Sequence, residues 1–175
     1  LMGLRRLIKN YLYRKKFDIS ESKIIVNKIN NQNIIITGAN SGIGLALTKK
    51  FLELDNKVFA TYNQTNDNLL KLTRDNLKIF QCDQSDIDNI DKLKDYINNV
   101  PVNIIINNAG IWGGKNQNFN KIDYGNFLKT SNINAISILK ISEIVLKYST
   151  KNTLKSILNI SSQYGSTEHN TTGRD

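Results

Sequence analysis

The sequence contains little cysteine, histidine or proline, and each scarcity excludes a class of protein. One cysteine, Cys82, excludes an internal disulfide and a cysteine-based zinc site. One histidine, His169, excludes a multi-histidine metal centre, so we expect no bound metal. No apolar run approaches the roughly 20 residues that a membrane-spanning helix needs. The free thiol favours a reducing compartment, and we expect a cytoplasmic protein.

The positive charge is concentrated at one end of the 175 residues. The chain has 24 lysines and arginines against 15 acidic residues, a net charge of +9. Residues 1–17 hold six of these basic residues, no acidic residue, and apolar residues at helical spacing. Such a segment could lie on an anionic membrane, bind a partner, act as an import signal, or be a loosely ordered leader. We treat residues 1–32 as a basic extension and expect no nucleic-acid partner.

Residues 33–175 alternate short apolar runs with helical patterns. This order predicts parallel strands buried on both faces, and therefore a doubly wound, Rossmann-like α/β sheet with five strands. Ser85 is the expected N-cap of the third helix. The expected strands are 34–36, 58–60, 77–80, 102–106 and 156–160, and the expected helices are 43–54, 68–72, 85–98, 119–128 and 133–148.

A glycine-rich turn, Thr37-Gly38-Ala39-Asn40-Ser41-Gly42-Ile43-Gly44, follows the first strand and leads into a helix. Gly38 permits a tight turn, Gly42 lets the backbone approach a pyrophosphate, and Gly44 allows close packing of helix on sheet. The helix N-terminus then presents free N–H groups to phosphates. The position of this turn predicts a dinucleotide site.

Four features together resemble the short-chain dehydrogenases/reductases. They are the T-G-x-x-x-G-x-G turn, Asn107-Asn108-Ala109-Gly110, Asn134, and Ser161-Ser162. The segments 161–166 and 170–173 are most similar to the C-factor/sniffer-type carbonyl reductases. The resemblance implies catalytic roles for Ser162 and Asn134, and adenine binding by Asp83. It implies cofactor contacts for Thr37, Gly38, Asn40, Ser41, Gly42, Ile43, Gly44, Asn63, Asp83, Asn107, Ala109 and Gly110.

Several of these residues also have structural interpretations. Asp83 could merely cap the chain after the third strand, and Asn107 and Asn108 could satisfy loop backbone groups. Asn132 lies close enough to be mistaken for Asn134, which we prefer because Asn134-Ala135 resembles the family's sequence there. Ser162 is preferred over Ser161 because the second serine of the pair is catalytic in relatives.

The resemblance also implies a tyrosine general acid/base whose pKa is lowered by a lysine four residues later. No such pair follows Ser162, because the residue four positions after Tyr164 is Glu168. In relatives the tyrosine follows the serine by a dozen residues or more, which from Ser162 begins near Asp175. We therefore expect an incomplete, N-terminal part of a reductase that is inactive by itself.

The choice of nicotinamide cofactor depends on the end of the second strand. The sequence there is Ala60-Thr61-Tyr62-Asn63, with neither an acidic residue nor an arginine. Without a carboxylate to repel a 2′-phosphate, and with Thr61 and Asn63 as polar groups, NADP is favoured over NAD.

The remaining expectations concern substrates and partners. The substrate is a small carbonyl compound or alcohol. The apolar helix 133–148 matches a subunit interface in relatives, so a homodimer or homotetramer is expected for a complete form. Trp112 could line the site or pack within its loop. The alternative functions are a non-catalytic dinucleotide-binding or regulatory module, and a membrane-associated scaffold led by residues 1–17.

Overall fold

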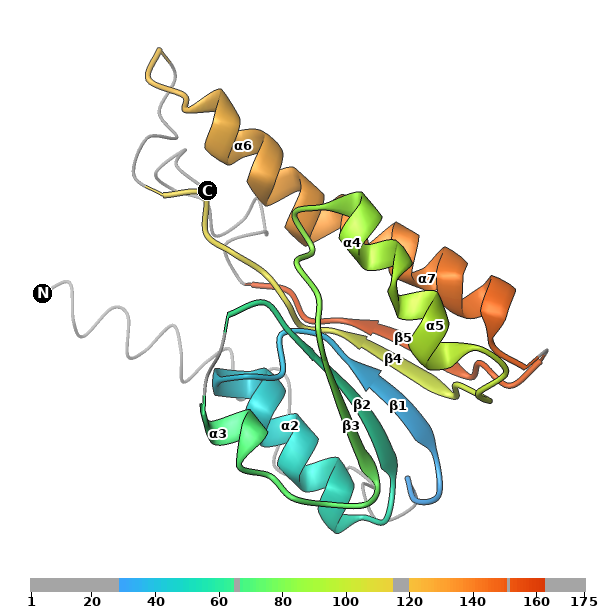
Figure 1. Ribbon diagram of the computed structural model, residues 1–175. Coiled ribbons are helices and arrows are strands. Elements are labelled where there is room, and N and C mark those ends of the chain that lie inside the picture. Colours follow the sequence, from blue (N-terminus) through green and yellow to red (C-terminus); the bar gives the residue numbers. More distant parts are fainter. Residues whose placement is uncertain (1–28, 65–66, 115–119, 151, 163–175) are drawn as a thin grey trace, which may run out of the picture.

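The computed structural model describes residues 29–64, 67–114, 120–150 and 152–162. Five parallel strands form one sheet in the order β3-β2-β1-β4-β5, with helices on both faces (Figure 1). This confirms the doubly wound α/β fold. The strands are β1 (Asn33–Ile36), β2 (Lys57–Tyr62), β3 (Leu77–Gln81), β4 (Ile104–Asn107) and β5 (Ser156–Asn159). The helices are α2 (Gly42–Glu53), α3 (Asp67–Leu70), α4 (Ile87–Asp91), α5 (Leu93–Ile97), α6 (Tyr124–Ser131), the π-helix η2 (Asn132–Ile136) and α7 (Ser137–Tyr148).

Alternating strand residues face two separate hydrophobic layers, as expected when helices cover both faces of a parallel sheet. Ile35, Phe59 and Ile105 point to the layer beneath α4, α5 and α7, and all three are fully buried. Their neighbours Ile34 and Ile36 point to the layer beneath α2 and α3. Helices on both faces therefore hold the central strands rigidly, which fixes the edge of the sheet where the strands end.

The helix predicted over 85–98 is two short helices, α4 and α5, and its expected N-cap was wrong. Asp86 is the N-cap of α4, where its carboxylate accepts hydrogen bonds from the backbone N–H groups of Asp88 and Asn89. Helix α4 begins at Ile87, so Ser85 lies one residue before the N-cap position, and its hydroxyl donates to Asp83 Oδ1 at 2.7 Å.

The two helices predicted over 119–128 and 133–148 are continuous in the described structure. Helix α6 begins at Tyr124, after the N-cap Asp123, and runs through η2 into α7 without a break. Around residue 130, where the sequence predicted a break, the chain forms a π-helical turn instead. This turn joins the two α-helical segments. Residues 115–119 lie outside the described part of the chain.

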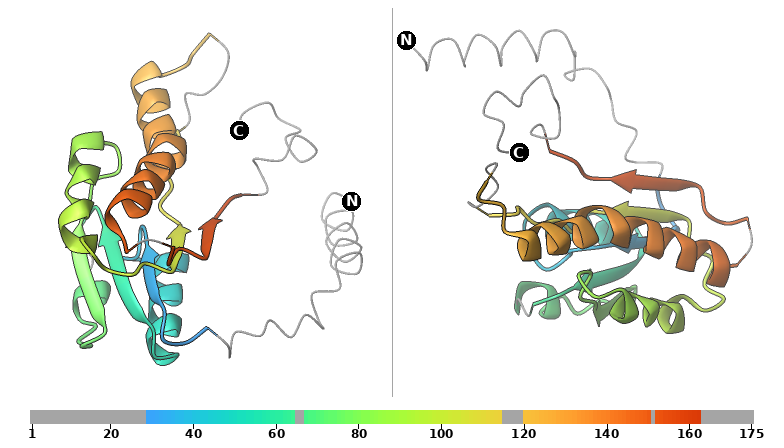
Figure 2. Two further views of the ribbon diagram at one scale, coloured as in Figure 1. Left: turned by 90° about the vertical axis from the view of Figure 1, so that its right-hand side faces the viewer. Right: turned by 90° about the horizontal axis from the view of Figure 1, so that it is seen from above.

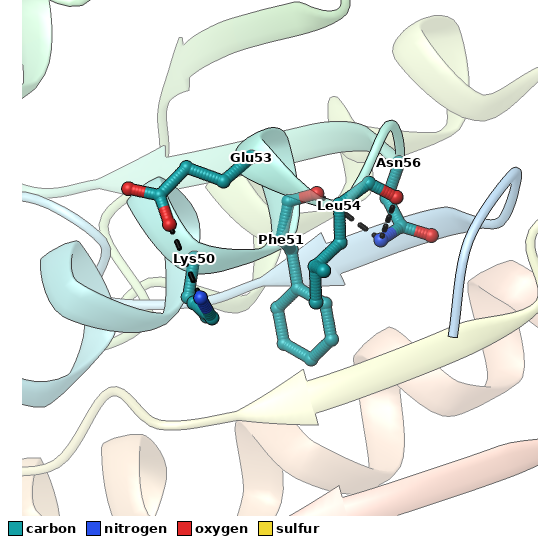
Figure 3. A network of polar contacts seen from close by, with 5 residues as sticks. All are labelled: Lys50, Phe51, Glu53, Leu54 and Asn56. Atoms are coloured by element: carbon teal, nitrogen blue, oxygen red, sulfur yellow. Dashed lines mark hydrogen bonds and ion pairs between the residues drawn. The ribbon is translucent and has the colours of Figure 1, made fainter. Parts of the chain in front are cut away.

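The end of α2 is tied to the start of the sheet by one buried side chain, Asn56. Its amide Nδ2 donates to the carbonyl oxygens of Phe51 and Leu54, at 3.1 and 3.2 Å, which satisfies carbonyl groups at the helix end (Figure 3). Its Oδ1 accepts the backbone N–H of Gln32 at 3.0 Å, immediately before β1. The same residue therefore sets both the exit of α2 and the entry of β1.

No helix in the described ranges is long and apolar enough to cross a bilayer. The basic segment 1–17 and His169 belong to residues that the structure does not describe.

Candidate functional site at the carboxyl edge of the sheet

Two loops meet where β1 and β4 end. Because the strands are parallel, the glycine-rich turn after β1 and the segment after β4 leave the same edge of the sheet. The hydroxyl oxygen of Thr37 accepts the backbone N–H groups of Asn108 and Ala109, each at 3.0 Å. The Thr37 side chain is 1% exposed, so these bonds are shielded from water. One threonine thus holds the start of the N-N-A-G segment.

Asn108 makes the reciprocal connection. Its side-chain amide donates to the carbonyl oxygens of Thr37 and Gly38, at 3.0 and 3.1 Å. Gly38 has φ +62°, and a Cβ there would lie 2.9 Å from the Cα of Ala109. The sequence-predicted residues of both loops are therefore brought together, and the tight approach requires glycine at position 38.

The turn before α2 is open where a ligand would lie. Gly42 has φ +52°, and no atom lies within 4 Å of the position that a Cβ would take. The N-cap Ser41 makes no side-chain capping bond, so it leaves the first-turn N–H groups of α2 to another acceptor. Asn40 Nδ2 reaches the carbonyl oxygen of Gln64 at 3.3 Å, and Ile43 is exposed. This open turn fits a pyrophosphate at the start of the helix.

Asp83 is held at the end of β3 by hydrogen bonds. Its Oδ1 accepts the backbone N–H of Ser85 at 2.9 Å in addition to the Ser85 hydroxyl, and Asn63 from the end of β2 also bonds to the carboxylate. Burial raises the pKa of Asp83, but the bonds from Ser85 and Asn63 and the charge of Lys129 outweigh it, so the net pKa is lowered. Asp83 and Asn63, both predicted cofactor residues, are therefore one connected group.

We expect Asp83→Asn to make stability less dependent on acid pH. The pKa of Asp83 is lower in the folded chain than in the unfolded chain. Its carboxylate therefore contributes stability above the unfolded pKa of about 4, and this contribution is lost as pH falls through the folded pKa. Urea unfolding at pH 7 and pH 3 should show the difference between wild type and variant shrinking at pH 3. Asp75→Asn, at an exposed carboxylate, is the control, and an equal shrinkage there would contradict the assignment.

The structure separates the two candidate asparagines. Asn134 lies in η2 and forms a reciprocal pair with Ile111, accepting its N–H and donating to its carbonyl, both at 2.9 Å. Asn132 instead donates to the carbonyl oxygen of Ser85, at 3.3 Å, on the side of α4. Asn134 is therefore the one joined to the segment that follows Gly110, and its active-site role stays a prediction.

The predicted residues at the ends of β4 and β5 differ in burial. Asn107 is 3% exposed, and its amide is directed across the sheet to Asn159 Oδ1, at 2.9 Å. Ser161 and Ser162 are exposed just beyond β5, which lies at the sheet edge beside β4 (Figure 2). The catalytic role of Ser162 and the cofactor role of Asn107 stay predictions. The partnership of Asn107 with Asn159 was not anticipated, and in a single sequence only the shared strand-end position could have suggested it.

Three other residues near this edge clarify the earlier alternatives. Trp112 is 68% exposed, so the interpretation that it packs within its loop is wrong. Thr61 is 1% exposed, and this burial removes it as a polar contact for a 2′-phosphate. Cys82 is a buried core residue just after β3, where burial, followed by the charges of Asp83 and Asp86, raises its pKa to about 11. Among the described residues, no three metal-binding side chains are grouped as a metal site would require.

Comparison with known proteins identifies the family. The sequence model described as short chain dehydrogenase matches residues 32–173. The chain belongs to the short chain dehydrogenase family. Two curated proteins that it resembles are uncharacterized oxidoreductases. They are YDL114W of Saccharomyces cerevisiae, 36% identical over 83 residues, and DltE of Bacillus subtilis, 35% identical over 91 residues. These alignments cover 46% and 48% of this chain, and 27% and 34% of the relatives.

A solved carbonyl reductase has a similar arrangement of strands and helices. The NADPH-bound carbonyl reductase from chicken fatty liver superposes with a TM-score of 0.68 at 25% identity, over 82% of this chain and 64% of that one. The match supports the Rossmann-like architecture. This chain spans about a third, or less, of the length of the two curated relatives.

Proposed function

We propose that this chain is the dinucleotide-binding part of an NAD(P)-dependent oxidoreductase that reduces a carbonyl or oxidises a hydroxyl of a small molecule. The observation that carries the proposal is the joining of the glycine turn to the N-N-A-G segment through Thr37 and Asn108. A module that only binds a dinucleotide needs neither Asn134 nor Ser162. The presence of both residues in this sequence favours the enzyme over the non-catalytic alternative.

The cofactor, when bound, supplies the hydride, and the protein binds and orients it. The open turn at Ser41 and Gly42 would receive the pyrophosphate, and Asp83 the adenine. At the end of β2 the described chain carries no carboxylate that would repel a 2′-phosphate. The chicken carbonyl reductase, to which this chain is similar, has NADPH bound, which agrees with a preference for NADP. We therefore propose NADP in preference to NAD.

The proton-transfer half of the reaction requires a tyrosine and lysine in addition to the residues described. Ser162 would hydrogen-bond the substrate oxygen, and Asn134 would take part in the proton relay. Because no Tyr-x-x-x-Lys follows Ser162 in residues 1–175, we expect no turnover from this chain alone. Detectable cofactor-dependent carbonyl reduction by residues 1–175 would contradict that expectation.

A complete form is proposed to be a cytoplasmic homodimer or homotetramer. On α6 and α7 the large apolar side chains of Phe127, Leu128, Leu139 and Leu146 are exposed, whereas Ile141 is fully buried. An exposed apolar face of this extent is typical of a protein–protein contact. The surface agrees with the expectation from the sequence that this helix forms a subunit interface.

The experiment that tests the proposal is a cofactor titration that uses the single tryptophan of the chain as the reporter. Trp112 is exposed next to Ile111, which Asn134 holds, so a nicotinamide bound there should quench its emission. We expect saturable quenching by NADPH at lower concentrations than by NADH. A calorimetric titration of the Trp112→Phe variant measures cofactor binding without relying on tryptophan emission. If NADH bound at least about tenfold more tightly, a difference of about 1.4 kcal/mol, the preference for NADP would be wrong. If neither cofactor bound, the proposed function would be wrong.

A further inference from the structure

The last paired residues of β4 and β5 are joined by a side-chain bridge. Asn107 and Asn159 are register partners in the parallel pair. Asn107 Nδ2 donates to Asn159 Oδ1 at 2.9 Å, and the backbone N–H of Ile160 donates to the carbonyl oxygen of Asn107, also at 2.9 Å. One side-chain bond and one backbone bond therefore connect the strands at the point where they end.

Beyond this bridge, each strand leads into part of the proposed site. Asn107 is followed directly by Asn108 and Ala109, whose backbone is held by Thr37. Asn159 is followed by Ile160 and the serine pair 161–162. The position of Ser162 relative to the cofactor turn is consequently set within three residues of the bridge.

The burial of the two partners makes the bridge important for that position. All four residues of β5 are exposed, and in the described part of the chain β5 has β4 as its single neighbour, so packing constrains its end weakly. Asn107 is buried, and its Oδ1 already lacks a hydrogen-bond partner among the described residues. Removal of the Asn159 oxygen would leave the whole Asn107 amide buried and unpaired, which is an unfavourable state.

We propose that Asn159 is a positioning residue that fixes the carboxyl end of β5, and with it Ser162, against the cofactor turn. The proposal rests on the proposed function for the significance of Ser162. The bridge itself can be tested without cofactor or turnover. A purely structural role would instead lower the stability of the whole sheet uniformly.

Amide hydrogen exchange of residues 1–175, measured by NMR, distinguishes these roles because it reports local and global opening separately. In Asn159→Ala we expect the exchange of the Ile160 amide, which donates to Asn107, to accelerate about tenfold more than that of Ile35, in the buried strand β1. Asn159→Asp retains an oxygen acceptor for Asn107 Nδ2 and should restore slow exchange. Ser156→Ala, at the opposite end of β5, is the matched control and should leave both amides unchanged.

A double-mutant cycle then assigns the effect to the pair. In an Asn107→Leu background, Asn159→Ala should cause no further acceleration at Ile160, because the bridge is already absent. Parallel acceleration at Ile160 and Ile35, equal behaviour of the Asp and Ala variants, or full additivity in the cycle would each overturn the proposal. None of these results depends on cofactor binding, so failure here is distinguishable from failure of the titration.

Discussion

Replacement of Gly44 by alanine is expected to abolish cofactor binding and to destabilise the domain by about 3 kcal/mol or more, at the upper end of the range for overpacking. A Cβ at this position would clash with the carbonyl oxygen of Gly38 and lie 2.5 Å from Asn108 Nδ2. Both atoms belong to the connection between the glycine turn and the N-N-A-G segment. The side chain can be accommodated only if the start of α2 moves away from Gly38 and Asn108.

The control for this variant is Gly42→Ala in the same turn. No atom lies within 4 Å of the Cβ position at Gly42, so only the left-handed backbone conformation, φ +52°, opposes the substitution. The expected cost is about 1–2 kcal/mol. Urea unfolding monitored by circular dichroism, together with NADPH titration, measures both effects. Equal destabilisation by the two variants would show that backbone strain, and not the close packing of α2, explains the glycine at position 44.

The parts of the fold that the sequence predicted are those encoded by local signals. Apolar runs such as Ile34–Ile36 and Ile104–Ile106 identified strands because β-branched residues in short runs favour buried parallel strands. The glycine turn was recognised because its three glycines follow the first strand directly. The structure confirms this placement and brings the turn into contact with Asn108 and Ala109.

The features that the sequence did not predict depend on contacts between distant segments. The π-helical turn places Asn134 against Ile111, 23 positions away, and nothing in the local sequence specifies that pairing. The bridge from Asn107 to Asn159 spans 52 positions. Candidate catalytic residues could therefore be named from the sequence, whereas the bonds that hold them required the fold.

The second large effect is expected from Thr37→Val, which retains the shape of the side chain and removes the acceptor for two backbone N–H groups. Asn108 N and Ala109 N would each lose a partner at 3.0 Å in a partly buried site. At roughly 1 kcal/mol or more for each unsatisfied donor, the expected destabilisation is about 2–4 kcal/mol. NADPH affinity should fall as well, since the N-N-A-G segment would no longer be held against the glycine turn.

Thr48→Val provides a matched comparison because Thr48 is also a buried threonine close to the same turn. Its hydroxyl donates to the carbonyl oxygen of Gly44 at 2.9 Å, so the substitution removes one donor from a helix carbonyl and leaves no backbone N–H without a partner. We expect a loss of about 1 kcal/mol and unchanged NADPH affinity. If the two variants lowered the free energy of unfolding and the affinity equally, the Thr37 hydroxyl would have no special part in joining the loops. If Thr37→Val lowered both the free energy of unfolding and the NADPH affinity more than Thr48→Val, the Thr37 hydroxyl oxygen would be the atom that holds the N-N-A-G segment against the glycine turn.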